Sequence, residues 1–165
     1  MAEPPPRIRA LVMDSSADTL DLLRQYLEFN GFEVETCNLA RLRNEGADVA
    51  ATIAEAHPDV VVFDIALPYE MNWELCAALR GDPRIGVPFV LTTTNRAAVE
   101  RLTGAREVIE ILGKPYDLEQ FARAVRAAVT ARENPASGAA HDDRRGADRR
   151  TGDRRHTDRR RDPPD

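Results

Sequence analysis

The sequence has few cysteines, no long apolar run and almost no lysine. Its two cysteines, Cys37 and Cys76, are too few for a disulfide framework and cannot form a zinc site alone, which favours a reducing cytoplasm. No stretch approaches the roughly 20 continuous apolar residues of a membrane span, and residues 1–10 lack the apolar core of a signal peptide. We therefore expect a cytoplasmic protein without a transmembrane segment.

The charge is moderate and unevenly distributed. Of the 165 residues, 23 are Lys or Arg and 28 are Asp or Glu, for a net charge of −5, and 42% are hydrophobic, which is enough for a core. Residues 1–132 carry a net charge of −6 and residues 133–165 a net charge of +1. An acidic body argues against a compact nucleic-acid-binding core. Lysine occurs once, at Lys114, in a chain that otherwise uses arginine.

The composition divides the chain into three parts. Residues 1–6 are a proline-rich lead-in that we predict to be flexible, and residues 7–132 alternate between apolar runs and amphipathic stretches and form the predicted domain. Residues 133–165 contain no Val, Leu, Ile, Met or aromatic side chain. Burial cannot offset the entropy of ordering such a segment, so we predict a disordered tail.

The middle part predicts an α/β fold, because short apolar runs alternate with helical stripes. Asn30-Gly31 is expected to end the first helix, since glycine favours the left-handed conformation just past a helix. Five strands separated by helices predict a doubly wound, five-stranded parallel sheet with helices on both faces. We place the strands at 8–13, 32–37, 60–63, 89–92 and 108–112, and helical segments at 20–27, 49–56, 73–80 and 118–129.

Polar side chains follow four of the predicted strands at the point where each strand ends. Asp14-Ser15 follows the first strand, Asp64 the third, Thr93-Thr94 the fourth and Lys114-Pro115 the fifth. The carboxyl ends of parallel strands lie at one edge of a sheet, where functional groups gather. Two carboxylates with a lysine suit a divalent cation such as Mg²⁺ together with a phosphoryl group, whose oxygens a lysine and a hydroxyl can bind.

Four motifs, in this order, resemble those of the receiver domain of two-component response regulators, in the CheY-like superfamily. VMDSSADTL resembles the acidic-pair motif, and VVVFDIALP resembles the strand that carries the phosphoacceptor aspartate, followed by x-x-Leu-Pro. VPFVLTTTN resembles the Thr/Ser switch strand, and EILGKPYDL resembles the Lys-Pro motif. The resemblance covers about residues 7–132 and implies a flavodoxin-like fold.

The resemblance also implies roles for individual residues. Asp64 is implied as the phosphoacceptor, Thr93 as the switch hydroxyl and Lys114 as the clamp on the phosphoryl group. It implies a Mg²⁺ ion held by Asp14, by Asp64 and by the backbone carbonyl of Ala66. A single-domain response regulator is a phosphoacceptor signalling protein and not an enzyme.

Each assignment has a plainer alternative. Asp64 is also explained as a turn or helix-capping aspartate, Asp14 as a solvated acid at a strand end and Lys114 as a surface lysine. Pro88 favours Thr93 as the switch residue, although the three consecutive threonines allow the assignment to slip by one position.

The sequence departs from the family pattern at four places. Ser15 stands where the family usually has a second acid, so the metal site keeps at best a weak ligand there, and Ser15 is equally explained as the N-cap of the first helix. Asn72 replaces a glycine, and because Asn tolerates positive φ we predict that the turn is kept. Ile111 stands at the aromatic switch position, and residues 39–47 form an inserted loop.

We expect Asp64 to accept a phosphoryl group from a histidine kinase or a phosphotransfer protein. By resemblance, the output is contact with a downstream protein through helix four, strand five and helix five of the family fold. The main alternative is a pseudo-receiver, an interaction module that works without phosphorylation, which Ser15 and Ile111 favour.

The tail repeats Asp-Arg-Arg every five residues from Asp143, and residues 144–161 hold nine Arg and three Asp. Three explanations of this repeat are open. It is a solvated segment of mixed charge, or its arginines bind nucleic acid or an anionic membrane, or it binds an acidic protein partner. Residues 144–149, Arg-Arg-Gly-Ala-Asp-Arg, also resemble the arginine motif of PilZ domains, which bind a nucleotide second messenger, but no β-barrel sequence accompanies them.

Overall fold

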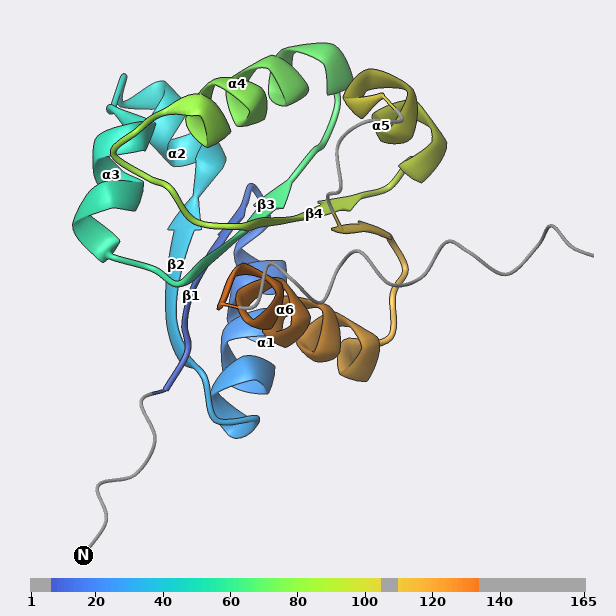
Figure 1. Cartoon of the computed structure of the whole chain (residues 1–165). Coiled ribbons are helices and arrows are strands. Elements are labelled where there is room, and N and C mark those ends of the chain that lie inside the picture. The colour runs from blue at the N-terminus through green and yellow to red at the C-terminus, as the bar shows by residue number, and fades with distance from the viewer. Residues whose placement is uncertain (1–6, 105–109, 134–165) are drawn as a thin grey trace, which may run out of the picture.

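A computed structural model describes residues 7–104 and 110–133 of the chain (Figure 1). The predicted flexible lead-in at 1–6 and residues 134–165 of the predicted tail lie outside the described residues. Within the described part, no helix is long and apolar enough to cross a membrane.

Five parallel strands form one sheet in the order β2-β1-β3-β4-β5, which confirms the predicted fold class. All five residues of the central strand β3 are buried, because a parallel strand inside such a sheet is covered on both faces. The strands are β1 (Arg9–Asp14), β2 (Glu33–Asn38), β3 (Val60–Asp64), β4 (Phe89–Thr93) and β5 (Glu110–Gly113).

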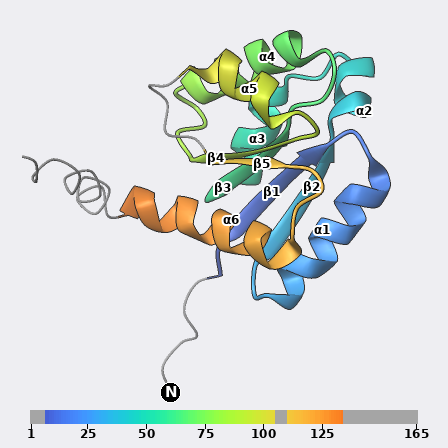
Figure 2. The same cartoon turned by 90° about the vertical axis from the view of Figure 1, so that its right-hand side faces the viewer.

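Helices cover both faces of the sheet. The helices are α1 (Ala17–Phe29), α2 (Leu39–Asn44), α3 (Val49–Ala56), α4 (Tyr69–Gly81), α5 (Arg96–Thr103) and α6 (Leu118–Glu133). Figure 1 shows α1 and α6 below the sheet and α2, α3, α4 and α5 above it, and the view in Figure 2 shows the same layers. The helix α6 reaches Glu133, one residue past the predicted end of the domain.

Each face of the sheet packs its own hydrophobic core, because successive side chains of a strand point to opposite faces. In β3, Val61 and Phe63 belong to the core under α2 to α5, whereas Val60 and Val62 belong to the core over α1 and α6. By the same alternation, Asp64 lies on the face of Val60 and Val62. The strand that contributes to both cores therefore also places a carboxylate at the edge of the sheet.

The first helix begins and ends at identifiable residues. The Ser16 side chain accepts a hydrogen bond from the backbone N–H of Thr19 at 3.3 Å, so Ser16, and not Ser15, is the N-cap. The predicted end at Asn30-Gly31 is confirmed, since Asn30 is the C-cap and Gly31 has φ +86°.

Two helices were not predicted from the sequence. Residues 39–47 are not simply a loop, because they contain α2, whose start is capped by the Asn38 side chain accepting from the N–H of Arg41 at 3.0 Å. The helix α5 is similarly capped by Asn95 and buries only Val99, so its apolar stripe is too short to recognise. The predicted fifth strand overlaps β5, and its first two residues, 108 and 109, lie outside the described residues.

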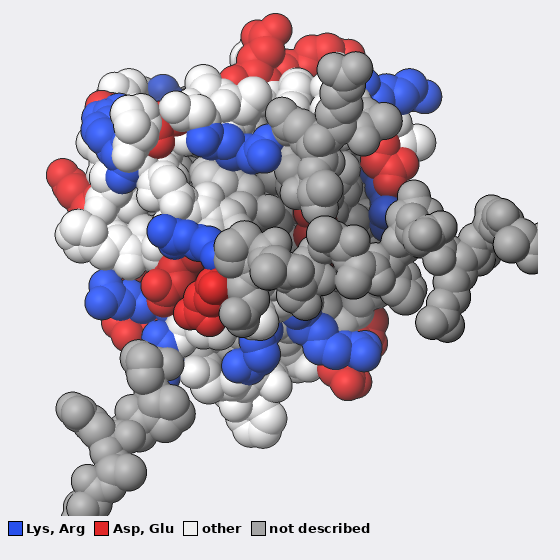
Figure 3. All heavy atoms as spheres, viewed as in Figure 1, with Lys and Arg blue, Asp and Glu red and all other residues white. Residues whose placement is uncertain are grey.

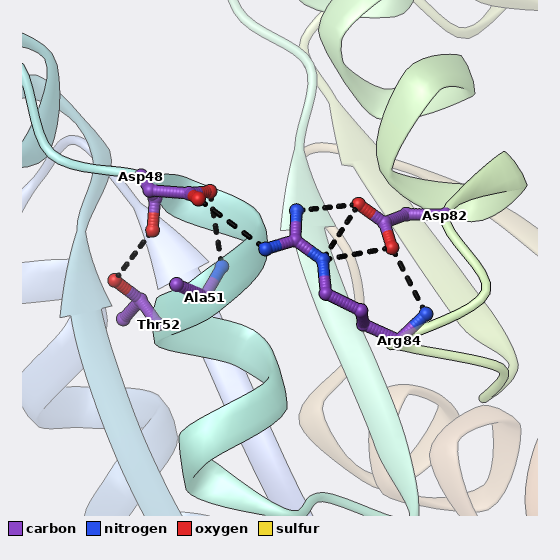
Figure 4. A network of polar contacts seen from close by, with 5 residues as sticks. All are labelled: Asp48, Ala51, Thr52, Asp82 and Arg84. Atoms are coloured by element: carbon purple, nitrogen blue, oxygen red, sulfur yellow. Dashed lines mark hydrogen bonds and ion pairs between the residues drawn. The ribbon is translucent and has the colours of Figure 1, made fainter.

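An exposed polar network ties the start of α3 to the loop after α4 (Figure 4). The Arg84 guanidinium lies 2.7 Å from a carboxylate oxygen of Asp82 and 3.3 Å from one of Asp48. Asp48 also caps α3, where it accepts from the N–H of Ala51 at 3.1 Å. That hydrogen bond, followed by the one from Arg84, lowers the pKa of Asp48. The network holds the loop that leads into β4 against α3.

Candidate functional site

Two buried carboxylates and a lysine meet at the carboxyl end of the sheet. Asp14 ends β1 and Asp64 ends β3, and these residues are only 4% and 7% exposed. Lys114 directly follows β5, and its Nζ lies 2.8 Å from Asp14 Oδ2 and 2.8 Å from Asp64 Oδ1. The structure therefore brings together three residues that the sequence placed at strand ends, although Asp14 and Lys114 are 100 positions apart.

The backbone around Lys114 fixes where its side chain begins. The N–H of Lys114 donates to the carbonyl of Thr93 at 2.7 Å, which extends the pairing of β5 with β4 by one residue. The peptide bond between Lys114 and Pro115 is cis. The ammonium group can thus reach both carboxylates from a defined position.

The hydroxyl that touches Asp64 belongs to Thr92. Thr92 lies opposite Asp64 in the β3–β4 register, and its Oγ1 donates to Asp64 Oδ1 at 2.9 Å. Thr93, the residue predicted as the switch hydroxyl, is fully buried, and its Oγ1 accepts from the N–H of Asn95 at 3.2 Å. Because side chains alternate along β4, Thr92 and Thr93 point to opposite faces of the sheet.

The two carboxylates differ in how their oxygens are held. Asp14 Oδ1 accepts from the N–H of Ser16 at 2.8 Å while Asp14 Oδ2 faces Lys114. Asp64 Oδ1 accepts from both Thr92 and Lys114, and Asp64 Oδ2 has no hydrogen-bond partner within 7–104 and 110–133. No fully buried side-chain oxygen in that part of the chain lacks a partner, so Asp64 Oδ2 reaches solvent.

The loop after β3 is held by a side chain of α4. Asn72 is 3% exposed, and its amide Nδ2 donates to the backbone carbonyl of Ala66 at 2.6 Å. The Asn72 carbonyl in turn accepts from the guanidinium of Arg43 on α2. The predicted turn with positive φ at Asn72 was wrong, because Asn72 lies in the first turn of α4 and His57 is the only non-glycine residue with positive φ in the described part of the chain.

Burial and hydrogen bonding act in opposite directions on the pKa values of Asp64 and Lys114. Burial is the main cause that raises the pKa of Asp64, the nearby Asp14 adds to it, and Lys114 opposes it. Burial alone would lower the pKa of Lys114, but its hydrogen bonds with Asp14 and Asp64 outweigh that effect and raise it. Burial also raises the pKa of Tyr116, whose ring stacks on Phe121 with centroids 5.3 Å apart. The site thus keeps its lysine charged and makes ionisation of Asp64 costly.

Comparison with known proteins finds relatives in sequence and similar structures in fold. The response regulator MprA of Mycolicibacterium vanbaalenii is 33% identical over 135 residues, which are 80% of this chain and 54% of that protein. A CheY-like response regulator receiver domain from Methanospirillum hungatei has a TM-score of 0.58 and 24% identity, covering 79% of this chain and 100% of that chain. The chain contains a response-regulator receiver domain.

A further solved structure has a similar fold. A sensor protein from Polaromonas sp. matches the receiver domain with a TM-score of 0.61 and 25% identity over 76% of this chain and 98% of that chain. The chain spans about half the length of the curated relatives it matches. No family model matches it.

The site offers few oxygen ligands for a metal ion, but they are of the kind that a hard cation prefers. No group of three or more His, Cys, Asp or Glu side chains in the described ranges is arranged to hold a metal ion. Mg²⁺, however, is commonly held by one or two carboxylates and several waters. Asp14 and Asp64 supply two carboxylates, and the Ala66 carbonyl keeps a second lone pair beside its bond to Asn72. Ser15 is exposed and adds no charge.

Sequence reasoning missed two residues that shape the site, Thr92 and Arg43, and expected a different role for Asn72. The period of two along β4 could have placed Thr92 on the same face as Asp64, since Val90 and Val62 share that face. No sequence signal links Arg43 to Asn72, because the contact depends on how α2 packs beside α4.

Proposed function

We propose that the receiver domain accepts a phosphoryl group on Asp64 from the phosphohistidine of a histidine kinase or phosphotransfer protein and signals by protein–protein contact. The observation that carries this proposal is the asymmetry of the Asp64 carboxylate. Its Oδ1 is held by Lys114 Nζ at 2.8 Å and by Thr92 Oγ1 at 2.9 Å, while its Oδ2 reaches solvent. A phosphorus atom can therefore approach a fixed oxygen nucleophile.

The other residues of the site act on charge and position. Lys114 places an ammonium group beside the position of the incoming phosphoryl oxygens and can neutralise part of their charge. Thr93 is the proposed switch residue, and its hydroxyl would donate to the phosphoryl group, since in the bond with the N–H of Asn95 the hydroxyl oxygen is only the acceptor. Asp14, Asp64 and the Ala66 carbonyl are the groups that would hold Mg²⁺, which supplies further positive charge when bound.

The test exposes the full chain to acetyl phosphate with Mg²⁺ and measures its intact mass, with Asp64→Asn and Asp59→Asn as parallel variants. Asp59 accepts a hydrogen bond from the N–H of Arg9 and precedes β3, so it controls for loss of a carboxylate elsewhere. We expect one phosphate on the wild type and on Asp59→Asn, and none on Asp64→Asn. An adduct of equal yield on Asp64→Asn would contradict the proposal.

The output surface is proposed by resemblance. Helix four, strand five and helix five of the family fold correspond here to α5, β5 and α6, because α2 adds one helix to the count. The predicted aromatic switch position is Ile111, which is buried in the core under α2 to α5. Coupling from Thr93 to this surface therefore cannot use an aromatic ring at that position.

A pseudo-receiver is the second candidate function, and Ser15 favours it. A neutral hydroxyl is a poorer ligand for a hard cation than the carboxylate that the family usually has at this position. If the receiver domain works without phosphorylation, acetyl phosphate leaves the wild-type mass unchanged while partner binding persists in Asp64→Asn. The nucleic-acid contact suggested by the arginine repeat falls on residues outside the described ranges and stays a sequence-based prediction.

A further inference from the structure

Thr92 makes a contact that the predicted set of site residues does not include. Its hydroxyl donates to Asp64 Oδ1 at 2.9 Å, and both residues are buried, at 2% and 7% exposure. The pair lies on the face of the sheet that packs against α1 and α6, directly across the β3–β4 register. A buried hydroxyl aimed at the proposed phosphoacceptor has a chemical consequence that depends on the charge of Asp64.

The strength of this hydrogen bond depends on whether Asp64 is a free carboxylate or carries a phosphoryl group. A hydroxyl bonds an ionised carboxylate roughly twice as strongly as it bonds a neutral acceptor. When Asp64 Oδ2 carries a phosphoryl group, Oδ1 becomes the carbonyl oxygen of an acyl phosphate and loses most of its negative charge. Thr92 therefore stabilises the free carboxylate more than the acyl phosphate.

We propose that Thr92 is a positioning residue that orients Asp64 for reaction at Oδ2 and shortens the lifetime of the phosphorylated state. This inference rests on the proposed function of Asp64. Lys114 holds the same oxygen at 2.8 Å, so two donors fix Oδ1 and leave Oδ2 as the oxygen that forms the bond to phosphorus. The carboxylate cannot exchange its two oxygens without breaking both contacts.

The effect on lifetime follows from the hydrolysis step. A water oxygen attacks phosphorus, the bond between Asp64 Oδ2 and phosphorus breaks, and its electron pair returns to the carboxylate. The water oxygen and both of its protons leave with the released phosphate. Negative charge grows on Oδ1 as this bond breaks, so the Thr92 hydroxyl binds the transition state more strongly than the acyl phosphate and accelerates the step.

The experiment compares the phosphate lifetime of the wild type, Thr92→Val and Thr92→Ser after removal of acetyl phosphate. Val keeps the shape of Thr without its hydroxyl, and Ser restores the hydroxyl. We expect Thr92→Val to extend the lifetime roughly threefold to tenfold, the range spanned by one ordinary hydrogen bond, and Thr92→Ser to return it to near the wild-type value. Thr92→Ala is a second variant without the hydroxyl and should act in the same direction.

Thr52→Val is the matched control, because it removes the same hydroxyl from α3, outside the site. The Thr52 hydroxyl donates to the backbone carbonyl of Asp48 at 3.1 Å. The phosphate lifetime of Thr52→Val should equal that of the wild type. A wild-type chain that takes no phosphate overturns the proposed function of Asp64 and this inference with it. A wild-type chain that is phosphorylated and has the same lifetime as Thr92→Val and Thr92→Ala overturns only the role of Thr92.

Discussion

The Asp64 side chain is costly to ionise because of its surroundings. It is buried beside a second carboxylate, Asp14, and a single ammonium group, Lys114, serves both. Burial raises the pKa of Asp64 despite the lysine. A carboxyl group whose pKa is higher in the folded than in the unfolded chain stabilises the fold below its unfolded pKa, and that stability is lost as the pH rises through the folded pKa.

Replacing Asp64 by Asn should therefore stabilise the receiver domain at neutral pH. The substitution removes the costly charge, and the Asn oxygen can still accept from Thr92. We expect a higher melting temperature than the wild type at pH 7, and a gain that shrinks as the pH falls toward the usual range of a carboxyl pKa. Thermal unfolding followed by circular dichroism over a pH series measures this. Asp21→Asn, at an exposed position of α1, controls for net charge, and a lower melting temperature of Asp64→Asn at pH 7 would contradict the account.

We predict that Ser15 limits how tightly the site can hold a cation. It follows β1 and is exposed, while Ser16 takes the role of N-cap, so Ser15 has no capping function to lose. Ser15→Asp should tighten Mg²⁺ binding by at least the roughly 10-fold to 100-fold that supporting residues of metal sites are worth. Titration calorimetry or the fluorescence of Trp73 measures the affinity. Equal affinities for the wild type and Ser15→Asp would show that this position does not contribute to the metal site.

The sequence predicted the ionisable residues of the site but not the hydroxyl that contacts Asp64. Asp14, Asp64 and Lys114 were predictable because each stands where a strand ends, and parallel strands end at one edge. Thr92 was not predicted, because the motif favoured Thr93 and only the β3–β4 register shows which threonine lies opposite Asp64. Whether Thr93 acts as the switch stays a prediction.

The helix α2 is linked to the loop after β3 through one side chain. Its Arg43 reaches α4 and donates to Asn72, whose amide holds the Ala66 carbonyl two residues after Asp64. The inserted helix is thus connected by hydrogen bonds to the loop that the resemblance assigns to the metal. This contact explains why a buried Asn, with two donors and two acceptor lone pairs to satisfy, is stable at this position.

Arg43→Ala should destabilise the receiver domain by about 1–3 kcal/mol, because the buried Asn72 carbonyl then has no partner. Urea unfolding measures the change. Arg41→Ala is a matched control on the same helix, since the Arg41 side chain is 78% exposed and pairs with the exposed Glu45, and it should leave the midpoint almost unchanged. Equal midpoints for the two variants would show that α2 does not brace the loop.

The elements that the sequence predicted are those with long or strongly apolar patterns. The strand β3 is buried along its whole length and α6 carries a long apolar stripe, whereas α2 and α5 are six and eight residues long and bury one side chain each. Both of these short helices depend on an Asn side chain at the N-cap and on the core beneath them. Their stability comes from packing against the sheet, which a sequence pattern of this length does not reveal.

At the scale of the whole molecule, charge separates the body from the segment that follows it. On the face shown in Figure 3, basic and acidic side chains of the described residues are interspersed without a large patch of one sign. Residues 144–161, by contrast, hold nine Arg and three Asp. Exposed ion pairs are worth only about 0–1 kcal/mol each and are screened by salt, so we predict no lasting contact between this segment and the body.

Removal of residues 134–165 should therefore leave the thermal unfolding midpoint of the receiver domain nearly unchanged at physiological salt. The removed residues contain no Val, Leu, Ile, Met or aromatic side chain that could add to either core. Differential scanning calorimetry at low and physiological salt measures the midpoints of both chains. A midpoint that falls on truncation, and falls more at low salt, would instead show that the arginine repeat docks on the acidic body.

The central claim is that Asp64 is the residue that takes the phosphoryl group, and the most direct test converts that bond into a permanent mark. Borohydride reduces an aspartyl phosphate to homoserine, so the full chain is treated with acetyl phosphate and Mg²⁺, reduced, digested and mapped by tandem mass spectrometry. The account predicts homoserine at position 64 and an unchanged aspartate at position 14. Homoserine at Asp14, or no homoserine at either position, would contradict it.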